Sequence, residues 1–156
     1  MTKLLLSIHV LASILVVGPI AVAASLFPRY ARKAAEEDGG SAGAVALLHR
    51  ICSGYAIVGV AVPVFGIATG KQLGVLTDAW LITSIVLTTI AAAILALAIL
   101  PGQERMIETT STAAEGTDTD TARSAARLAG LTGVFNLLWA VVVVLMIVRP
   151  GSTTGA

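Results

Sequence analysis

Long apolar segments alternate with polar ones along the whole chain of 156 residues. The four apolar segments are 4–27, 44–69, 79–100 and 128–148. Each reaches the roughly 20 residues that a helix rising ~1.5 Å per residue needs to cross a bilayer. The pattern predicts an all-α membrane protein with four transmembrane helices in an antiparallel bundle. This bundle fills residues 1–150 as a single domain, and we expect residues 151–156 to be a disordered tail.

Prolines, glycines and charges close each apolar segment. The predicted stops are Pro28-Arg29, Gly70-Lys71, Pro101-Gly102 and Arg149-Pro150. Beyond the first stop, a basic cluster followed by acidic residues could extend the helix by a turn or two, until Gly39-Gly40 ends it. The polar, Thr-rich segment 101–127 is expected to be a flexible loop. The short connection 71–78 makes the second and third helices antiparallel neighbours.

Basic residues are distributed unevenly between the connections, and those beside membrane segments stay on the cytoplasmic side. The first and third connections carry Arg29, Arg32, Lys33, Arg50, Arg105, Arg123 and Arg127, whereas the termini and the second connection carry only Lys3, Lys71 and Arg149. We therefore expect both termini to be extracytoplasmic, in a multi-pass protein of the bacterial plasma membrane. A signal peptide cleaved near Ala23 would place the first basic cluster outside, so the first helix is expected to remain uncleaved.

Composition agrees with a membrane protein and excludes several other classes. Hydrophobic residues make up 56% of the chain and charged residues 12%, and the mean hydropathy is +0.92. A net charge of +1, with basic residues scattered at helix ends, gives no basic face for nucleic acid. The single cysteine, Cys52, excludes an internal disulfide, a CxxC redox pair and a cysteine metal cluster.

Small residues form a stripe on the third helix. Successive i+4 positions are occupied by Trp80, Ser84, Thr88, Ala92 and Ala96. On the second helix, Gly66 and Gly70 have GxxxG spacing. Helices in lipid associate through such close-packing surfaces because no hydrophobic force draws them together. We interpret both features as interface packing, within the bundle or against a partner helix.

Polar residues inside apolar segments are expensive in a bilayer and are the first candidates for function. His9 lies in the outer third of the first helix, and Asn136 lies near the middle of the fourth, where we expect it to make an interhelical hydrogen bond. No Asp or Glu lies within an apolar segment, which argues against a proton-coupled exporter. At the cytoplasmic interface, Arg50, Arg123 and Arg127 serve as topogenic charges or as contacts for lipid head groups.

Two histidines in four helices raise the possibility of a haem b with two imidazole ligands. His9 lies toward the outer face and His49 at the cytoplasmic start of the second helix. Their depths differ by roughly 25 Å at ~1.5 Å per residue, so one protomer cannot close such a site. His9 could still be the lone ligand of a haem b or a copper ion. Otherwise it makes an interhelical hydrogen bond, to Ser13 or to a hydroxyl of the third helix.

Several short motifs resemble one family. The first helix has the form LLxxHVLxxIxxVGP and is followed by FPRYAR; the second opens with LHRIxxxY; the third opens with Trp80 and ends in LPGQER. These motifs resemble the uncharacterised bacterial integral-membrane family of domain of unknown function 2269, which implies four membrane helices and brings no activity. The first helix is also distantly similar to copper-resistance membrane proteins and to b-type cytochrome subunits. Those proteins carry further histidines at matching depths, and the third and fourth segments here have none.

Three functions follow from these features. The chain has no cluster with the nucleophile, base or ligand makeup of a catalytic site, so we expect no enzymatic activity and no cofactor. The main prediction is an interaction, accessory or assembly subunit of a larger membrane complex, in contact with lipids and other membrane proteins or with copies of itself. The alternatives are a redox protein that binds haem b or copper at His9, and a protein that binds or transports a small molecule or lipid.

Overall fold

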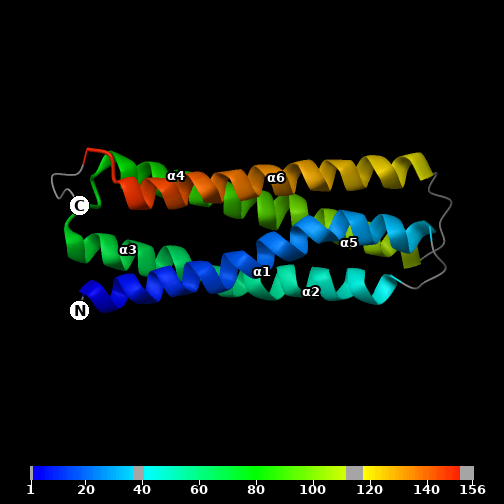
Figure 1. The fold of residues 1–156 in the computed structure, drawn as a ribbon, viewed down its shortest axis with the longest axis horizontal. Helices are drawn as coiled ribbons and strands as arrows, with labels where there is room; N and C mark the ends of the chain where they lie inside the picture. The colour runs from blue at the N-terminus through cyan, green and yellow to red at the C-terminus, as the bar shows by residue number, and fades with distance from the viewer. Residues whose placement is uncertain (1, 37–40, 112–117, 152–156) are drawn as a thin grey trace.

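The computed structural model describes residues 2–36, 41–111 and 118–151. The elements are α1 (Thr2–Glu36), α2 (Ala42–Gly59), α3 (Ala61–Leu73), α4 (Ala79–Ile94), η1 (Leu95–Ile99), α5 (Leu100–Ser111) and α6 (Asp118–Val148). They form four membrane-length helical rods: α1, α2 with α3, α4 with η1 and α5, and α6 (Figure 1). The predicted all-helical architecture with four transmembrane helices is confirmed.

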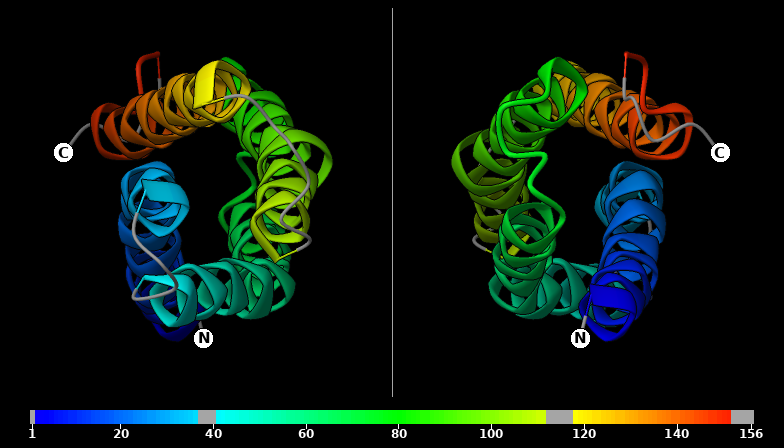
Figure 2. Two further views of the ribbon diagram at one scale, coloured as in Figure 1. Left: turned by 90° about the vertical axis from the view of Figure 1, so that its right-hand side faces the viewer. Right: turned by 90° about the vertical axis from the view of Figure 1, so that its left-hand side faces the viewer.

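The four rods form a ring when the bundle is seen along its long axis (Figure 2). α1 packs against α2 and α3 on one side and against α6 on the other, and α4 packs against α6. The fourth side differs between the two ends of the bundle. α5 packs against α2, whereas α3 and α4 meet at only a few positions. The helices are therefore closely packed around the α2 and α5 end and looser between α3 and α4.

Two of the four predicted helix ends are wrong, and a third lies within the extension that the sequence allowed. α1 continues through Pro28 to Glu36, within the turn or two of extension that the charge pattern allowed, and residues Gly39-Gly40 lie outside the described residues. α3 passes Gly70-Lys71 and ends before Gly74, which has a left-handed φ of 71°. The helix after Pro101 continues to Ser111. Only the stop after Val148 is where the sequence places it.

The segment predicted as a flexible loop, 101–127, is largely helical. α5 covers its first part and α6 begins at Asp118, while 112–117 lie outside the described residues. Tertiary packing explains the extra turns: Phe27 and Ala31 of α1, Met106 of α5 and Leu128 of α6 are buried in one cluster. The predicted disordered tail lies outside the described residues from 152 onward.

A π-helical turn, η1, lies directly before Pro101. A proline inside an α-helix clashes with the carbonyl four residues earlier, and the wider π turn relieves that crowding. The turn also changes the register of the buried face. Positions Leu95, Ile99 and Gln103 all point into the bundle, with exposures of 7%, 0% and 1%.

Candidate functional site

A cavity of about 1080 Å³ lies between the first half of α1, α3, α4 and the last half of α6. It occupies the end of the bundle where α1 begins and α6 ends (Figure 1). Most of the lining is aliphatic, and the polar lining residues are His9, Ser13, Ser84, Thr88, Thr89 and Arg149. Ligand pockets have this character: they measure ~300–1,000 Å³ and are mostly apolar, with a few polar groups that orient the ligand.

His9 is held in the cavity wall by the backbone of α3. Its Nδ1 lies 2.9 Å from the carbonyl oxygen of Val62, and because a carbonyl only accepts, Nδ1 carries the hydrogen. The Nε2 atom is then a hydrogen-bond acceptor, and it makes no hydrogen bond to another described residue. The hydroxyl of Ser13 donates to the backbone oxygen of His9 at 2.8 Å. The ring therefore bonds a main-chain carbonyl and neither of the hydroxyl partners that the sequence suggested.

Part of the small-residue stripe of the third rod faces the interior of its own bundle. Trp80 and Ser84 are buried, with exposures of 5% and 0%, and Thr88 and Ala92 line the cavity. Ala92 and Ala96 are both exposed, but Ala96 lies outside the cavity lining. The stripe therefore turns away from the cavity at its last member.

The two glycines of the GxxxG pair contact other parts of this chain. A Cβ on residue Gly66 would lie 2.9 Å from Cε1 of His9, and one on Gly70 would lie 2.8 Å from Cδ2 of Leu81. Both distances are shorter than side chains tolerate, so each glycine permits a close helix contact. Gly66 is the position that admits the His9 ring.

Trp80 contacts Arg149, the residue that follows α6. The guanidinium of Arg149 lies over the indole ring, 5.6 Å from its centroid, in a cation–π arrangement. The indole Nε1 donates to Oδ2 of Asp78 at 3.1 Å. Arg149 also lines the cavity, which gives its wall a positive charge.

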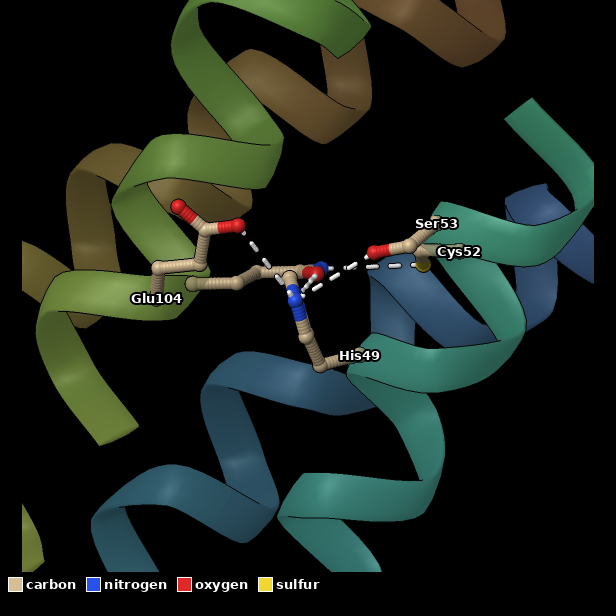
Figure 3. A network of polar contacts seen from close by, with 5 residues as sticks. His49, Cys52, Ser53 and Glu104 are labelled. Carbon is tan, nitrogen blue, oxygen red and sulfur yellow. Dashed lines mark hydrogen bonds and ion pairs between the residues drawn. The ribbon is translucent and has the colours of Figure 1, made fainter. Parts of the chain in front are cut away.

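A second polar site links α2 to α5 (Figure 3), and none of its residues lines the cavity. His49 Nδ1 donates to Oε1 of Gln103 at 3.0 Å, and the Ser53 hydroxyl donates to Nε2 at 3.2 Å. Gln103 Nε2 in turn donates to Sγ of Cys52 at 3.6 Å. Oε1 of Glu104 lies 3.7 Å from His49 Nε2, so a protonated His49 would gain an ion pair there. The network holds the two helices together.

Gln103 is a site residue that the sequence does not predict. The residue is only 1% exposed, although it follows Pro101 in a segment whose composition predicts a loop. The signal in the sequence is the i+4 spacing that places Gln103 after the apolar residues Leu95 and Ile99. His49 and His9 bond different helices, α5 and α3 respectively, so the structure does not bring the two imidazoles together.

Three buried polar atoms follow one face of α6. Asn136 Nδ2 donates to the hydroxyl of Ser25 on α1 at 3.2 Å. No described residue bonds the Asn136 Oδ1 atom, the Thr132 hydroxyl or the Trp139 Nε1 atom. These positions have the i, i+4, i+7 spacing of one helix face. Asn136 therefore connects α6 to α1. The same face of α6 also carries three buried polar atoms that form no hydrogen bond with a described residue.

The three predicted head-group arginines differ in their surroundings. Arg50 is exposed on α2. Arg123 pairs with Asp120 at 3.5 Å, and Arg127 lines a smaller pocket between α5 and α6. Within the described ranges, no group of three or more His, Cys, Asp or Glu side chains could hold a metal ion.

The fold and the cavity define an integral membrane protein of four helical spans with a largely apolar intramembrane pocket. The chain belongs to the family described as predicted integral membrane protein (DUF2269), whose model matches residues 3–150. The resemblance drawn from the sequence motifs is thereby confirmed. No curated protein and no solved structure matches the chain.

Proposed function

We propose that this protein binds a lipid-soluble small molecule that carries a hydroxyl group, within the plasma membrane of a bacterium and without a chemical step. The observation that supports the proposal is the cavity of about 1080 Å³, whose aliphatic wall contains His9 with an uncommitted Nε2. An acceptor nitrogen in an apolar wall favours a ligand that donates one hydrogen bond. The hydroxyl of Thr88, which bonds no other described residue, is a second polar contact.

Intrinsic fluorescence provides a direct assay because the chain has two tryptophans. Trp139 lines the cavity, and Trp80 contacts Arg149, another lining residue. A brominated long-chain alcohol bound in the cavity is expected to quench them saturably in protein reconstituted into nanodiscs. The brominated alkane of equal length is expected to bind about tenfold more weakly, since it leaves the His9 acceptor unpaired. Quenching by both probes without saturation would overturn the proposal.

Ala92 and Ala96 provide a matched pair of variants, one turn apart on the same rod. Ala92→Leu adds bulk to the cavity, whereas Ala96→Leu adds the same bulk outside it. The first is expected to weaken binding of the alcohol about tenfold or more, and the second to leave it unchanged. Equal effects of the two substitutions would place the ligand elsewhere.

A haem b or a copper ion at His9 is a second candidate function. A histidine that ligates a metal through one nitrogen commonly donates its other N–H to a backbone carbonyl, and the Nδ1 bond to Val62 has this form. The purified protein would then show a Soret band or bound copper that His9→Ala removes. A colourless, metal-free preparation that retains its native associations would contradict this candidate.

An accessory role in a larger membrane complex requires an outward-facing contact surface. Of the small-residue stripe, Ala96 faces outward beside Leu97, which is 78% exposed. We rank this role after ligand binding because the other members of the stripe are either buried or line the cavity. Copurification under mild detergent distinguishes the two: loss of a copurifying subunit, or of a homo-oligomer, in Ala96→Leu would support the accessory role.

A further inference from the structure

A second, smaller pocket lies between α5 and the first turns of α6, at the end of the bundle opposite the cavity (Figure 1). Its volume is about 260 Å³. The polar part of its wall consists of Arg105, Thr109, Asp120, Thr121, Ser124 and Arg127. The pocket shares no lining residue with the large cavity.

The floor of this pocket is apolar and closely packed. A Cβ on Gly102 would lie 2.8 Å from Cδ2 of Leu128, so α5 and α6 approach each other closely there. Leu128 and Met106 are buried, with exposures of 5% and 6%. Leu97 and Leu131 extend the lining along the rods, away from the arginines. The pocket therefore combines positively charged side chains in its wall with an apolar floor, which is the combination that binds an amphipathic ligand.

The polar part of the pocket wall has a net positive charge. Arg105 and Arg127 come from different helices, and neither pairs with an acidic group among the described residues. Among the described residues, the one carboxylate in the wall is that of Asp120, which lies 3.5 Å from Arg123. Arg123 does not line the pocket, so it neutralises part of the negative charge of Asp120 from outside the pocket wall. Two guanidinium groups beside the hydroxyls of Thr121 and Ser124 provide the donors that bind a phosphate group.

We propose that the Arg105–Arg127 pocket is a binding site for a phosphate group. The ligand is the head group of an anionic phospholipid or a soluble phosphate compound, and both would use the same two guanidinium groups. Basic pockets between membrane helices bind anionic head groups by this chemistry. The site is independent of the proposed hydroxyl ligand at His9.

Native mass spectrometry of the detergent-solubilised full chain tests the proposal. The probes are phosphatidylglycerol and phosphatidylcholine with identical acyl chains. The wild type is expected to retain one phosphatidylglycerol in preference to phosphatidylcholine. The double variant Arg105→Gln with Arg127→Gln is expected to bind it at least about tenfold more weakly. Arg50→Gln, which changes the net charge from an exposed position outside the pocket, is the control and is expected to bind like the wild type.

A second variant changes binding in the opposite direction. Asp120→Asn removes the carboxylate from the pocket wall and is expected to strengthen phosphatidylglycerol binding severalfold. Glu36→Gln removes an exposed charge at the end of α1 and is expected to have no effect. Wild-type affinity in the double arginine variant would overturn the proposal, as would an equal loss in Arg50→Gln or an equal gain in Glu36→Gln.

Inorganic phosphate distinguishes the two sources of the ligand. If millimolar phosphate displaces phosphatidylglycerol from the wild type, and binds with the same dependence on Arg105 and Arg127, the site accepts free phosphate. If phosphate does not compete, the apolar floor contributes to recognition and the ligand is the lipid. Both results support a phosphate-group site, and the behaviour of the arginine variants decides whether that site exists.

Discussion

The imidazole ring of His9 lies directly against Gly66, where a Cβ would approach Cε1 to 2.9 Å and Nδ1 to 3.2 Å. Gly66 lies one turn after Val62, the residue whose carbonyl accepts the Nδ1 hydrogen at 2.9 Å. The two contacts belong to one face of α3, since i and i+4 positions are neighbours on a helix. Gly66 thus provides the space and Val62 the hydrogen bond that fix the ring in the cavity wall.

Gly66→Ala should displace the ring or separate α1 from α3. We expect the substitution to reduce stability by about 1–3 kcal/mol, the usual cost of overpacking, and to lower the midpoint of thermal unfolding in detergent. Gly54→Ala is the control, because a Cβ there has no atom within 4 Å. It should be neutral or stabilising by up to ~1 kcal/mol through helix propensity. Equal destabilisation by both substitutions would show that the His9 contact has no special role.

The number and type of the membrane elements were predictable from the sequence, whereas their ends were not. Length and hydropathy alone identify a membrane helix. The helices continue past the predicted proline and glycine stops because tertiary packing stabilises further turns. Ala31 and Ala34, which follow Pro28, are buried, and so is Met106, which follows Pro101. The π turn before Pro101 removes the clash that would otherwise end the helix there.

The polar residues of the candidate site could be predicted individually, but their contacts could not. His9 and Asn136 were visible as polar groups within apolar segments. The partner of His9 depends on the helix break at Val60, which separates α2 from α3, and on the space above Gly66. Gln103 was missed because its burial follows from the continued helix and the shifted register of η1. Each missed contact depends on a local irregularity of the backbone.

Gln103→Met should weaken the junction between α2 and α5. The substitution keeps the length of the side chain but leaves His49 Nδ1 without its acceptor and Cys52 Sγ without its donor. We expect a loss of about 0.6–2 kcal/mol, the range for hydrogen bonds between membrane helices and for unpaired buried groups. Chemical denaturation in mixed micelles measures it. Gln72→Met on α3, an exposed position, is the control and should change stability little; a similar loss there would reject the network as the cause.

Asn136 and Ser25 should show a small coupling energy. The 3.2 Å hydrogen bond between them connects α6 to α1, and such bonds in membranes contribute of order 0.6 kcal/mol. A double-mutant cycle with Ser25→Ala and Asn136→Leu isolates this term. Asn136→Leu alone should cost little, because it also removes the buried Oδ1 atom that no described residue bonds. Additive effects of the two substitutions would mean that the bond contributes nothing to stability.

Both chain termini are predicted to be extracytoplasmic. The start of α1 and the end of α6 lie at the same end of the bundle (Figure 1), so they share one side of the membrane, and the basic residues of the first and third connections assign the opposite end to the cytoplasm. Single cysteines introduced by Ala42→Cys at an exposed position, Thr117→Cys and Ser152→Cys, each in a Cys52→Ala background, test this orientation. In intact cells an impermeant maleimide should label only the Ser152→Cys variant, and permeabilised cells should allow labelling of all three. Labelling of Ala42→Cys in intact cells would reverse the topology and would place the Arg105–Arg127 pocket, at the same end of the bundle, on the outer face.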